Sequence, residues 1–95
     1  MGDPRIKLEG YLDVPVERWA AIMSALETHI ELTRSEPGCI EFNVNPCIEI
    51  KHRLLVSELF ENQTSFDAHQ ARAAQSEWAE ISAGIPRQYE ISEVK

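Results

Sequence analysis

The sequence is poor in positive charge and in long apolar runs. It has 9 lysines and arginines against 16 aspartates and glutamates, a net charge of -7. A surface of this sign repels phosphate backbones and anionic lipids, so neither nucleic acid nor a membrane surface is expected as a partner. No apolar run approaches the roughly 20 residues that span a bilayer, and the N-terminus lacks the apolar centre of a signal peptide. We therefore expect a cytoplasmic protein.

Cysteine is also scarce, because only Cys39 and Cys47 are present. An extended chain would hold them about 26 Å apart, well beyond the roughly 7 Å that a disulfide bridges. The sequence lacks a phosphate-binding glycine loop, a Gly-x-Ser-x-Gly elbow and a Cys-x-x-Cys pair. Its three histidines and two cysteines match no recurring zinc spacing. We expect two free thiols and no metal site.

Regular patterns are present from one end of the chain to the other, and 95 residues fit a single domain, 1–95. Residues 5–13 alternate between apolar and polar side chains and predict a strand. Gly10 lies on its apolar face, where a glycine indicates close approach of another group. An apolar stripe at helical spacing then runs over 15–34 and ends at Glu36-Pro37-Gly38, where proline and glycine oppose continuation.

The second half of the chain predicts two more strands and a helix. Residues 39–45 and about 50–60 form a strand pair joined by a short loop, which favours an antiparallel hairpin. A helical region runs from Thr64 to about Gly84, and Thr64 with Asp67 resembles a capping box. A final short strand covers residues 88–92.

One straight helix over this region would place His69 and Trp78 on opposite sides. We therefore expect the helix to break near residues 72–76. The resulting β-α-β-β-α-β order predicts an α+β, ferredoxin-like fold, with a four-stranded antiparallel sheet and two helices on one face.

The strand at 50–60 is apolar on both faces. Leu54, Val56 and Phe60 lie on one face, and Leu55 and Leu59 lie on the other. Helices on one side of the sheet leave the second face uncovered, unless a second copy of the chain covers it. The sequence therefore predicts a homodimer.

Glu58 and His69 are the candidate catalytic residues. Glu58 alternates with Val56 and Phe60, so its carboxyl group should point between the sheet and the helices. There it must be hydrogen-bonded or have a raised pKa. Glu58 fits a structural acid tied to a backbone group or an arginine, and it also fits a general acid/base or substrate anchor. His69 follows the partly buried Phe66 by one turn and fits a core, surface or cavity position equally well.

Five residues are candidates for substrate binding: Phe60, Phe66, Trp78, Asn43 and His52. The three aromatic residues fit an ordinary core, but they could also line a flat apolar cavity suited to an aromatic substrate. His29, which borders the apolar stripe of the first helix, is a weaker candidate for touching a ligand.

Three stretches, in this order and spacing, resemble the antibiotic biosynthesis monooxygenase (ABM) domain family. They are Thr-Arg-Ser-Glu-Pro-Gly-Cys at 33–39, Leu-Val-Ser-Glu-Leu-Phe at 55–60 and Ser-Phe-Asp-Ala-His at 65–69. The resemblance covers nearly the whole chain. It implies a dimeric α/β barrel with a pocket between sheet and helices in each subunit.

Members of that family include quinol and anthrone monooxygenases that use dioxygen without metal or flavin, and haem-degrading enzymes share the fold. This sequence departs from the family pattern in three places. Phe60 stands where many relatives carry tryptophan, and Ala74 stands near where many carry a second histidine. The first strand has Glu9 and Tyr11 instead of the asparagine of haem-degrading relatives, which disfavours haem degradation.

The resemblance thus implies oxidation of a small aromatic, quinol-like or anthrone-like substrate, with dioxygen as co-substrate and no cofactor. His69 would act as the base or a hydrogen-bond anchor, and Glu58 would orient it or the substrate. The alternative is a non-catalytic dimer that binds a small molecule. A third interpretation is a structural partner domain whose own side chains fill the cavity. Fold alone does not decide among these.

Overall fold

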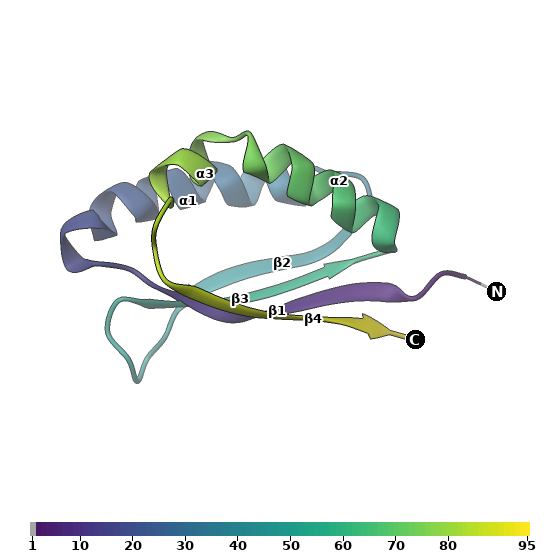
Figure 1. Cartoon of the computed structure of the whole chain (residues 1–95), viewed down its shortest axis with the longest axis horizontal. Helices are drawn as coiled ribbons and strands as arrows, with labels where there is room; N and C mark the ends of the chain where they lie inside the picture. The colour runs from purple at the N-terminus through teal and green to yellow at the C-terminus, as the bar shows by residue number, and fades with distance from the viewer. Residues whose placement is uncertain (1) are drawn as a thin grey trace.

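The computed structural model describes residues 2–95 of the chain. Its elements are β1 (Arg5–Asp13), η1 (Val16–Arg18), α1 (Trp19–Arg34), β2 (Cys39–Pro46), β3 (Arg53–Phe60), α2 (Gln63–Ala74), α3 (Glu77–Ile81) and β4 (Arg87–Val94). The strands form one antiparallel sheet in the order β2-β3-β1-β4, and the helices cover one face of it (Figure 1). The predicted α+β, ferredoxin-like fold is confirmed, with a third α-helix because the second helical region is divided.

The core lies between the sheet and the helices. The central strands and α1 supply most of the buried apolar side chains, among them Ile6, Leu8, Leu12, Ile22, Leu26, Leu54, Val56 and Phe60. The register pairs Leu8 of β1 with Glu58 of β3, so the carboxyl group of Glu58 lies in this same apolar layer.

Gly10 of β1 lies in close contact with β4. A Cβ atom at this position would lie 1.9 Å from the carbonyl oxygen of Gln88 and 2.7 Å from the ring of Tyr89. The close approach predicted from the sequence is therefore made by a neighbouring strand. It lets the ring of Tyr89 lie against the sheet at the level of Gly10.

The break in the second helical region is confirmed. The α2 helix ends at Ala74, and Ser76 begins α3 by accepting a hydrogen bond at its hydroxyl group from the N–H of Ala79. Since the axis changes there, His69 of α2 and Trp78 of α3 both line one cavity, which a single straight helix would prevent.

The start of α2 differs from the prediction. The capping residue is Asn62 and not Thr64, because the side chain of Asn62 accepts a hydrogen bond of 2.8 Å from the N–H of Ser65. Asp67 instead accepts a hydrogen bond from the side chain of Gln63, one turn earlier.

Two features of the strand pair also differ from the prediction. β3 begins at Arg53 and not near Ile50, because the chain turns at His52, which has a left-handed φ of 63°. A bulge between Cys39 and Glu41 interrupts the alternation of β2, and the side chain of Ile40 is exposed.

The face of the sheet opposite the helices carries exposed apolar side chains. Leu55 is 46% exposed, and Ile48 is fully exposed at the tip of the loop before β3. This loop projects from the sheet on the side away from the helices (Figure 1). Cys39 and Cys47 are both free, as predicted. None of the helices formed by residues 2–95 is long and apolar enough to cross a membrane.

Candidate functional site

His69 stands between two carboxylates. Its Nδ1 atom lies 2.7 Å from Oε1 of Glu36, and its Nε2 atom lies 3.7 Å from Oε1 of Glu58. The ring stacks on Phe60, with 4.9 Å between ring centroids, and only 3% of the histidine is exposed. The imidazole is therefore fixed in position by α2, by the stacked ring and by Glu36.

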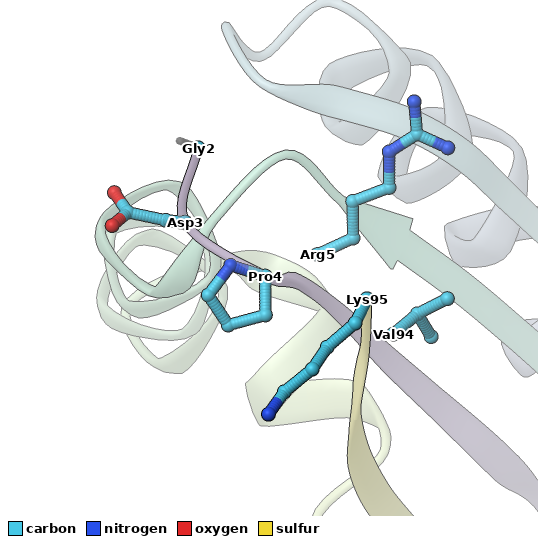
Figure 2. Close-up of a pocket in the computed structure, with 6 residues that line it drawn as sticks. All are labelled: Gly2, Asp3, Pro4, Arg5, Val94 and Lys95. Atoms are coloured by element: carbon cyan, nitrogen blue, oxygen red, sulfur yellow. The ribbon is translucent and has the colours of Figure 1, made fainter.

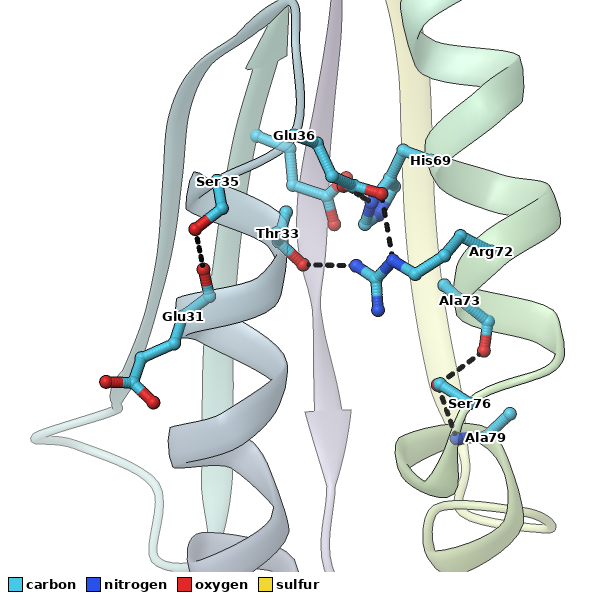
Figure 3. Close-up of polar contacts among 10 residues, drawn as sticks. Glu31, Thr33, Ser35, Glu36, His69, Arg72, Ala73, Ser76 and Ala79 are labelled. Atoms are coloured by element: carbon cyan, nitrogen blue, oxygen red, sulfur yellow. Dashed lines mark hydrogen bonds and ion pairs between the residues drawn. The ribbon is translucent and has the colours of Figure 1, made fainter.

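Glu36 is held by a hydrogen-bond network on the helix side (Figure 3). The Nε atom of Arg72 donates to Oε2 of Glu36 at 2.8 Å, and its Nη2 atom donates to the hydroxyl group of Thr33 at 2.9 Å. Burial pushes the pKa of Glu36 upward, but the hydrogen bonds from Arg72 and His69 lower it below its ordinary value. Glu36 is thus ionised at neutral pH, so Nδ1 of His69 carries a proton and donates a hydrogen bond to Glu36. Nε2 remains free to face Glu58.

The loop after α1 brings Glu36 to this place. Gly38 has a φ of 88°, a conformation that favours glycine. A Cβ atom at Gly38 would lie 2.1 Å from the hydroxyl oxygen of Ser65 at the start of α2. Glycine therefore lets the loop pass against α2, and Glu36 comes within reach of His69. The sequence shows Glu36 as part of a helix end and of the stretch that resembles the family, but it gives no sign of a contact with His69.

Glu58 lacks such support. It is 7% exposed, and its Oε1 atom has no hydrogen-bond partner among residues 2–95. The 3.7 Å to His69 is too long for a hydrogen bond. Burial, and then the negative charge of Glu36, raises the pKa of Glu58 to about 7. Both protonation states are therefore populated near neutral pH, which suits a general acid/base. An acid tied to a backbone group or an arginine is not what the described residues show.

Glu58 and His69 line a cavity of about 390 Å³ between the sheet and α2 and α3. Small residues of α2, of α3 and of the turn after α3 leave this space open: Ala73, Ala74, Ala79, Ala83 and Gly84. Ala74, where a second histidine is common in the family, is thus part of what makes room. The remaining lining residues are Leu8, His29, Gln70, Trp78, Ser82, Ile85, Arg87 and Tyr89.

Three residues that line the cavity have buried polar atoms without a hydrogen-bond partner among residues 2–95. These atoms are Nδ1 of His29, Oε1 of Glu58 and Oγ of Ser82. Each such group costs about 1–3 kcal/mol of stability, so native proteins contain few of them. Three such atoms belong to residues that line this one cavity.

His29 belongs to this site, although the sequence marks it only as a weak candidate. Its ring stacks on Trp78 with 5.1 Å between centroids, and it lies 6.0 Å from the ring of His69. Burial, assisted by the positive charge of Arg72, lowers the pKa of His29 to about 4. His29 is therefore a neutral imidazole at pH 7. The spacing of Leu26, His29 and Thr33 on one face of α1 is the signal that could have placed it inside.

The candidate aromatic residues divide between core and cavity. Trp78 lines the cavity, whereas Phe60 and Phe66 are fully buried and pack edge to face at 5.7 Å. Phe60 supports the ring of His69 from behind. Its role in the structure is to position the histidine.

Asn43 and His52 lie away from the cavity. Asn43 is exposed on the outward side of β2 and accepts a hydrogen bond of 3.3 Å from Arg34. His52 packs edge to face against Trp19, with 5.2 Å between ring centroids. Neither residue is among those that line the cavity around Glu58.

The last strand supplies cavity residues that the sequence does not single out. Tyr89 is half-buried, and burial raises the pKa of its phenol, so it is protonated at neutral pH. The guanidinium group of Arg87 donates to the backbone carbonyl groups of Ser82 and Ile85. The mostly polar sequence of β4 gives no sign of these contacts.

A larger hollow of about 620 Å³ lies between the two ends of the chain (Figure 2). It is lined by Gly2, Asp3, Pro4, Arg5, Val94 and Lys95. Its charged side chains are exposed to solvent, and none of its lining residues has a buried polar atom without a partner. We therefore assign the site to the cavity around Glu58. Across residues 2–95, no group of three or more His, Cys, Asp and Glu side chains is arranged to hold a metal ion.

The chain is thus an α+β, ferredoxin-like domain with an acid and an imidazole beside a cavity. Residues 5–81 match the family described as antibiotic biosynthesis monooxygenase, and the chain belongs to that family. The resemblance seen in the sequence is thereby confirmed.

Solved structures of low sequence identity share the fold. A provisionally named antibiotic biosynthesis monooxygenase from Nitrosomonas europaea superposes with a TM-score of 0.82 at 21% identity, over 98% of this chain and 91% of that one. A conserved protein from Methanosarcina mazei Go1 gives 0.78 at 23% identity, over 97% and 94%. No curated protein matches the chain in sequence.

Proposed function

We propose that the protein is a monooxygenase that oxidises a small aromatic, quinol-like or anthrone-like substrate with dioxygen, without metal or organic cofactor. Family membership supports the oxidoreductase class. The observation that carries the proposal is the pair formed by Glu58 and His69, 3.7 Å apart beside the cavity. The pKa of about 7 for Glu58 lets this pair take up and return a proton near neutral pH.

The chemistry follows from the properties of such substrates. Removal of a proton by Nε2 of His69 or by Glu58 makes the aromatic anion electron-rich enough to pass an electron to dioxygen. For an anthrone-like substrate, a ring CH₂ group becomes C=O, and the second oxygen atom leaves as water with the two hydrogens. Ionised Glu36 stabilises the imidazolium that forms when His69 takes the proton, because it accepts the Nδ1 hydrogen bond.

An oxygen electrode tests this proposal with a panel of quinols and anthrones, in the presence and absence of a chelator. His69→Ala and Glu58→Gln should each lower the rate of oxygen uptake at least tenfold, because each removes a proton-transfer group. Glu27→Gln, on the exposed side of α1, is the matched control and should keep the wild-type rate. Wild-type rates in both site variants would overturn the assignment.

The alternative function is a non-catalytic domain that binds a small molecule. The three unpartnered polar atoms around the cavity favour a ligand whether or not a reaction follows. This alternative predicts saturable binding of aromatic compounds with no consumption of dioxygen in the same panel.

We also propose that the protein is a homodimer in which a second copy covers the outward face of the sheet. Leu55 and the loop tip at Ile48 expose apolar surface there, which a partner would remove from water. Light scattering should give twice the chain mass of 10.8 kDa, and Leu55→Glu should shift the protein towards the monomer. A wild-type mass of one chain would contradict the dimer. A cytoplasmic location stays a prediction from the sequence.

A further inference from the structure

We propose that Arg87 and Tyr89 form an anion-binding subsite at the solvent-exposed end of the cavity, where they bind a carboxylate group of the substrate. The inference deepens the proposed function and rests on it in taking this cavity as the substrate site. It narrows the substrate class to aromatic acids, and it makes Arg87 and Tyr89 specificity-determining residues.

The first support is the placement of the two residues relative to the acid. Arg87, Tyr89 and Glu58 pair with residues 12, 10 and 8 of β1, and alternate residues of a strand share one face. All three line the same cavity. Residues 8 and 12 are about 13 Å apart along the strand. An aromatic substrate can therefore lie along this row, with its two ends at different residues.

The second support is the exposure of the row, which runs from the interior to the solvent. Glu58 is 7% exposed, Tyr89 is half-buried and Arg87 is exposed. Ala83 and Gly84, which also line the cavity, are exposed in the turn before β4. Arg87 therefore lies at the entrance of the cavity, where a ligand can reach it.

The third support is the state of the guanidinium group of Arg87, which is fixed in position but not neutralised. Its Nε atom donates to the carbonyl group of Ile85 at 3.1 Å, and its Nη2 atom donates to that of Ser82. These bonds leave the N–H groups of Nη1 for another acceptor. The ion pairs formed among residues 2–95 do not include Arg87, although the chain has 16 aspartates and glutamates. An anionic ligand would supply the missing counter-charge.

The fourth support is the phenol of Tyr89, which places a second donor beside this cation. Burial raises the pKa of the phenol, and the charge of Arg87 and a hydrogen bond from it partly offset the rise. Because an arginine side chain only donates, the phenol accepts from Arg87 and keeps its own proton for a ligand oxygen. A planar cation and a hydroxyl donor together suit the two oxygens of a carboxylate.

Matched probes test the subsite separately from the reaction. Calorimetry under argon at pH 7 and low ionic strength would compare 6-hydroxy-2-naphthoate with its methyl ester, which has the same rings and hydroxyl group but no charge. The wild-type protein should bind the carboxylate about tenfold more tightly than the ester. Arg87→Gln should bring the ratio of the two dissociation constants close to one, and Tyr89→Phe should lower it about threefold.

Arg5→Gln is the matched control, because it removes the same charge from an exposed arginine that does not line this cavity. It should keep the wild-type ratio. A wild-type ratio near one, a ratio that survives in both site variants, an equal drop in Arg5→Gln, or no binding of either probe would overturn the subsite. If Arg87→Gln does not fold, Tyr89→Phe decides.

The failure of this subsite and the failure of the proposed reaction give different results. A preference for the carboxylate without oxygen uptake by any quinol or anthrone would overturn the reaction and leave the subsite standing. Oxygen uptake together with equal binding of the two probes would overturn the subsite alone.

Discussion

The two sides of the His69 ring differ in how their polar groups are satisfied. On one side, ionised Glu36 accepts hydrogen bonds from both His69 and Arg72. On the other side, Glu58 has a buried oxygen atom without a partner and a pKa raised to about 7. The hydrogen bonds of Glu36 fix one tautomer of the imidazole and contribute to stability. The unpaired oxygen of Glu58 is unfavourable for folding, and a ligand or a proton can bind on this side.

The largest expected effect lies on the unsatisfied side. Glu58 ionises near pH 4.5 in the unfolded chain and near pH 7 in the folded one, so the folded protein binds more protons between these values. Its stability should therefore fall as the pH rises from 4.5 to 7, by about 3 kcal/mol from this group. Glu58→Gln removes this dependence. Urea unfolding at pH 4 and pH 8 measures it.

The informative quantity is the difference between variant and wild type at the two pH values. Glu58→Gln should gain about 3 kcal/mol relative to the wild type on going from pH 4 to pH 8. An equal difference in unfolding free energy at both pH values would show that ionisation of Glu58 does not destabilise the folded protein. The two sides of His69 would then not differ in this way.

On the side of Glu36, substitution should lower the unfolding free energy, and by a smaller amount. Glu36→Gln replaces an acceptor of two hydrogen bonds by an amide that donates towards one of its former donors. We expect a loss of about 2 kcal/mol of unfolding free energy, less than for a fully buried ion pair because Arg72 is 30% exposed. Urea unfolding at pH 7 measures the loss, and Glu27→Gln should stay within about 0.5 kcal/mol of wild type. A loss no larger than that of the control would mean that Glu36 does not support His69.

The smallest effect on stability is expected from the cap of α2, the helix that carries His69. Asn62→Ala removes the hydrogen bond of 2.8 Å that caps the first turn of this helix. It should lower the unfolding free energy by about 1 kcal/mol and leave the pKa of Glu58 unchanged. Thr64→Ala is the control, since Thr64 is exposed and lies two residues after the cap. A larger loss from Thr64→Ala than from Asn62→Ala would contradict the assigned cap.

The fold could be predicted from the sequence because the patterns that indicate its strands and helices are local. Alternation in residues 5–13, the apolar stripe of α1 and the conflict between His69 and Trp78 predict strand, helix and helix break. The errors of the prediction are also local. The start of β3 moved because His52 takes a left-handed conformation, and a bulge turns Ile40 outward and interrupts the alternation of β2. Neither event can be read from the periodicity of the sequence.

The site was accessible only in part. Alternation along one strand is enough to place Glu58 inside, and the helix break is enough to bring His69 towards it. The contacts that define the site join residues far apart in sequence, such as Glu36 with Arg72, and local patterns carry no information about them. Tyr89 comes from a mostly polar strand, so nothing in the sequence separates it from surface residues.

The most direct test of the contrast around His69 is the pKa of Glu58 in the folded protein. A carbon-13 NMR titration of the Glu58 carboxyl group, assigned by its loss in Glu58→Gln, gives this value. We expect a midpoint near pH 7 for Glu58, with Glu36 titrating below its ordinary range. A midpoint for Glu58 at the ordinary value of 4.5 would show that its carboxyl group is solvated or paired, and Glu58 would then not be the unsatisfied neighbour of His69.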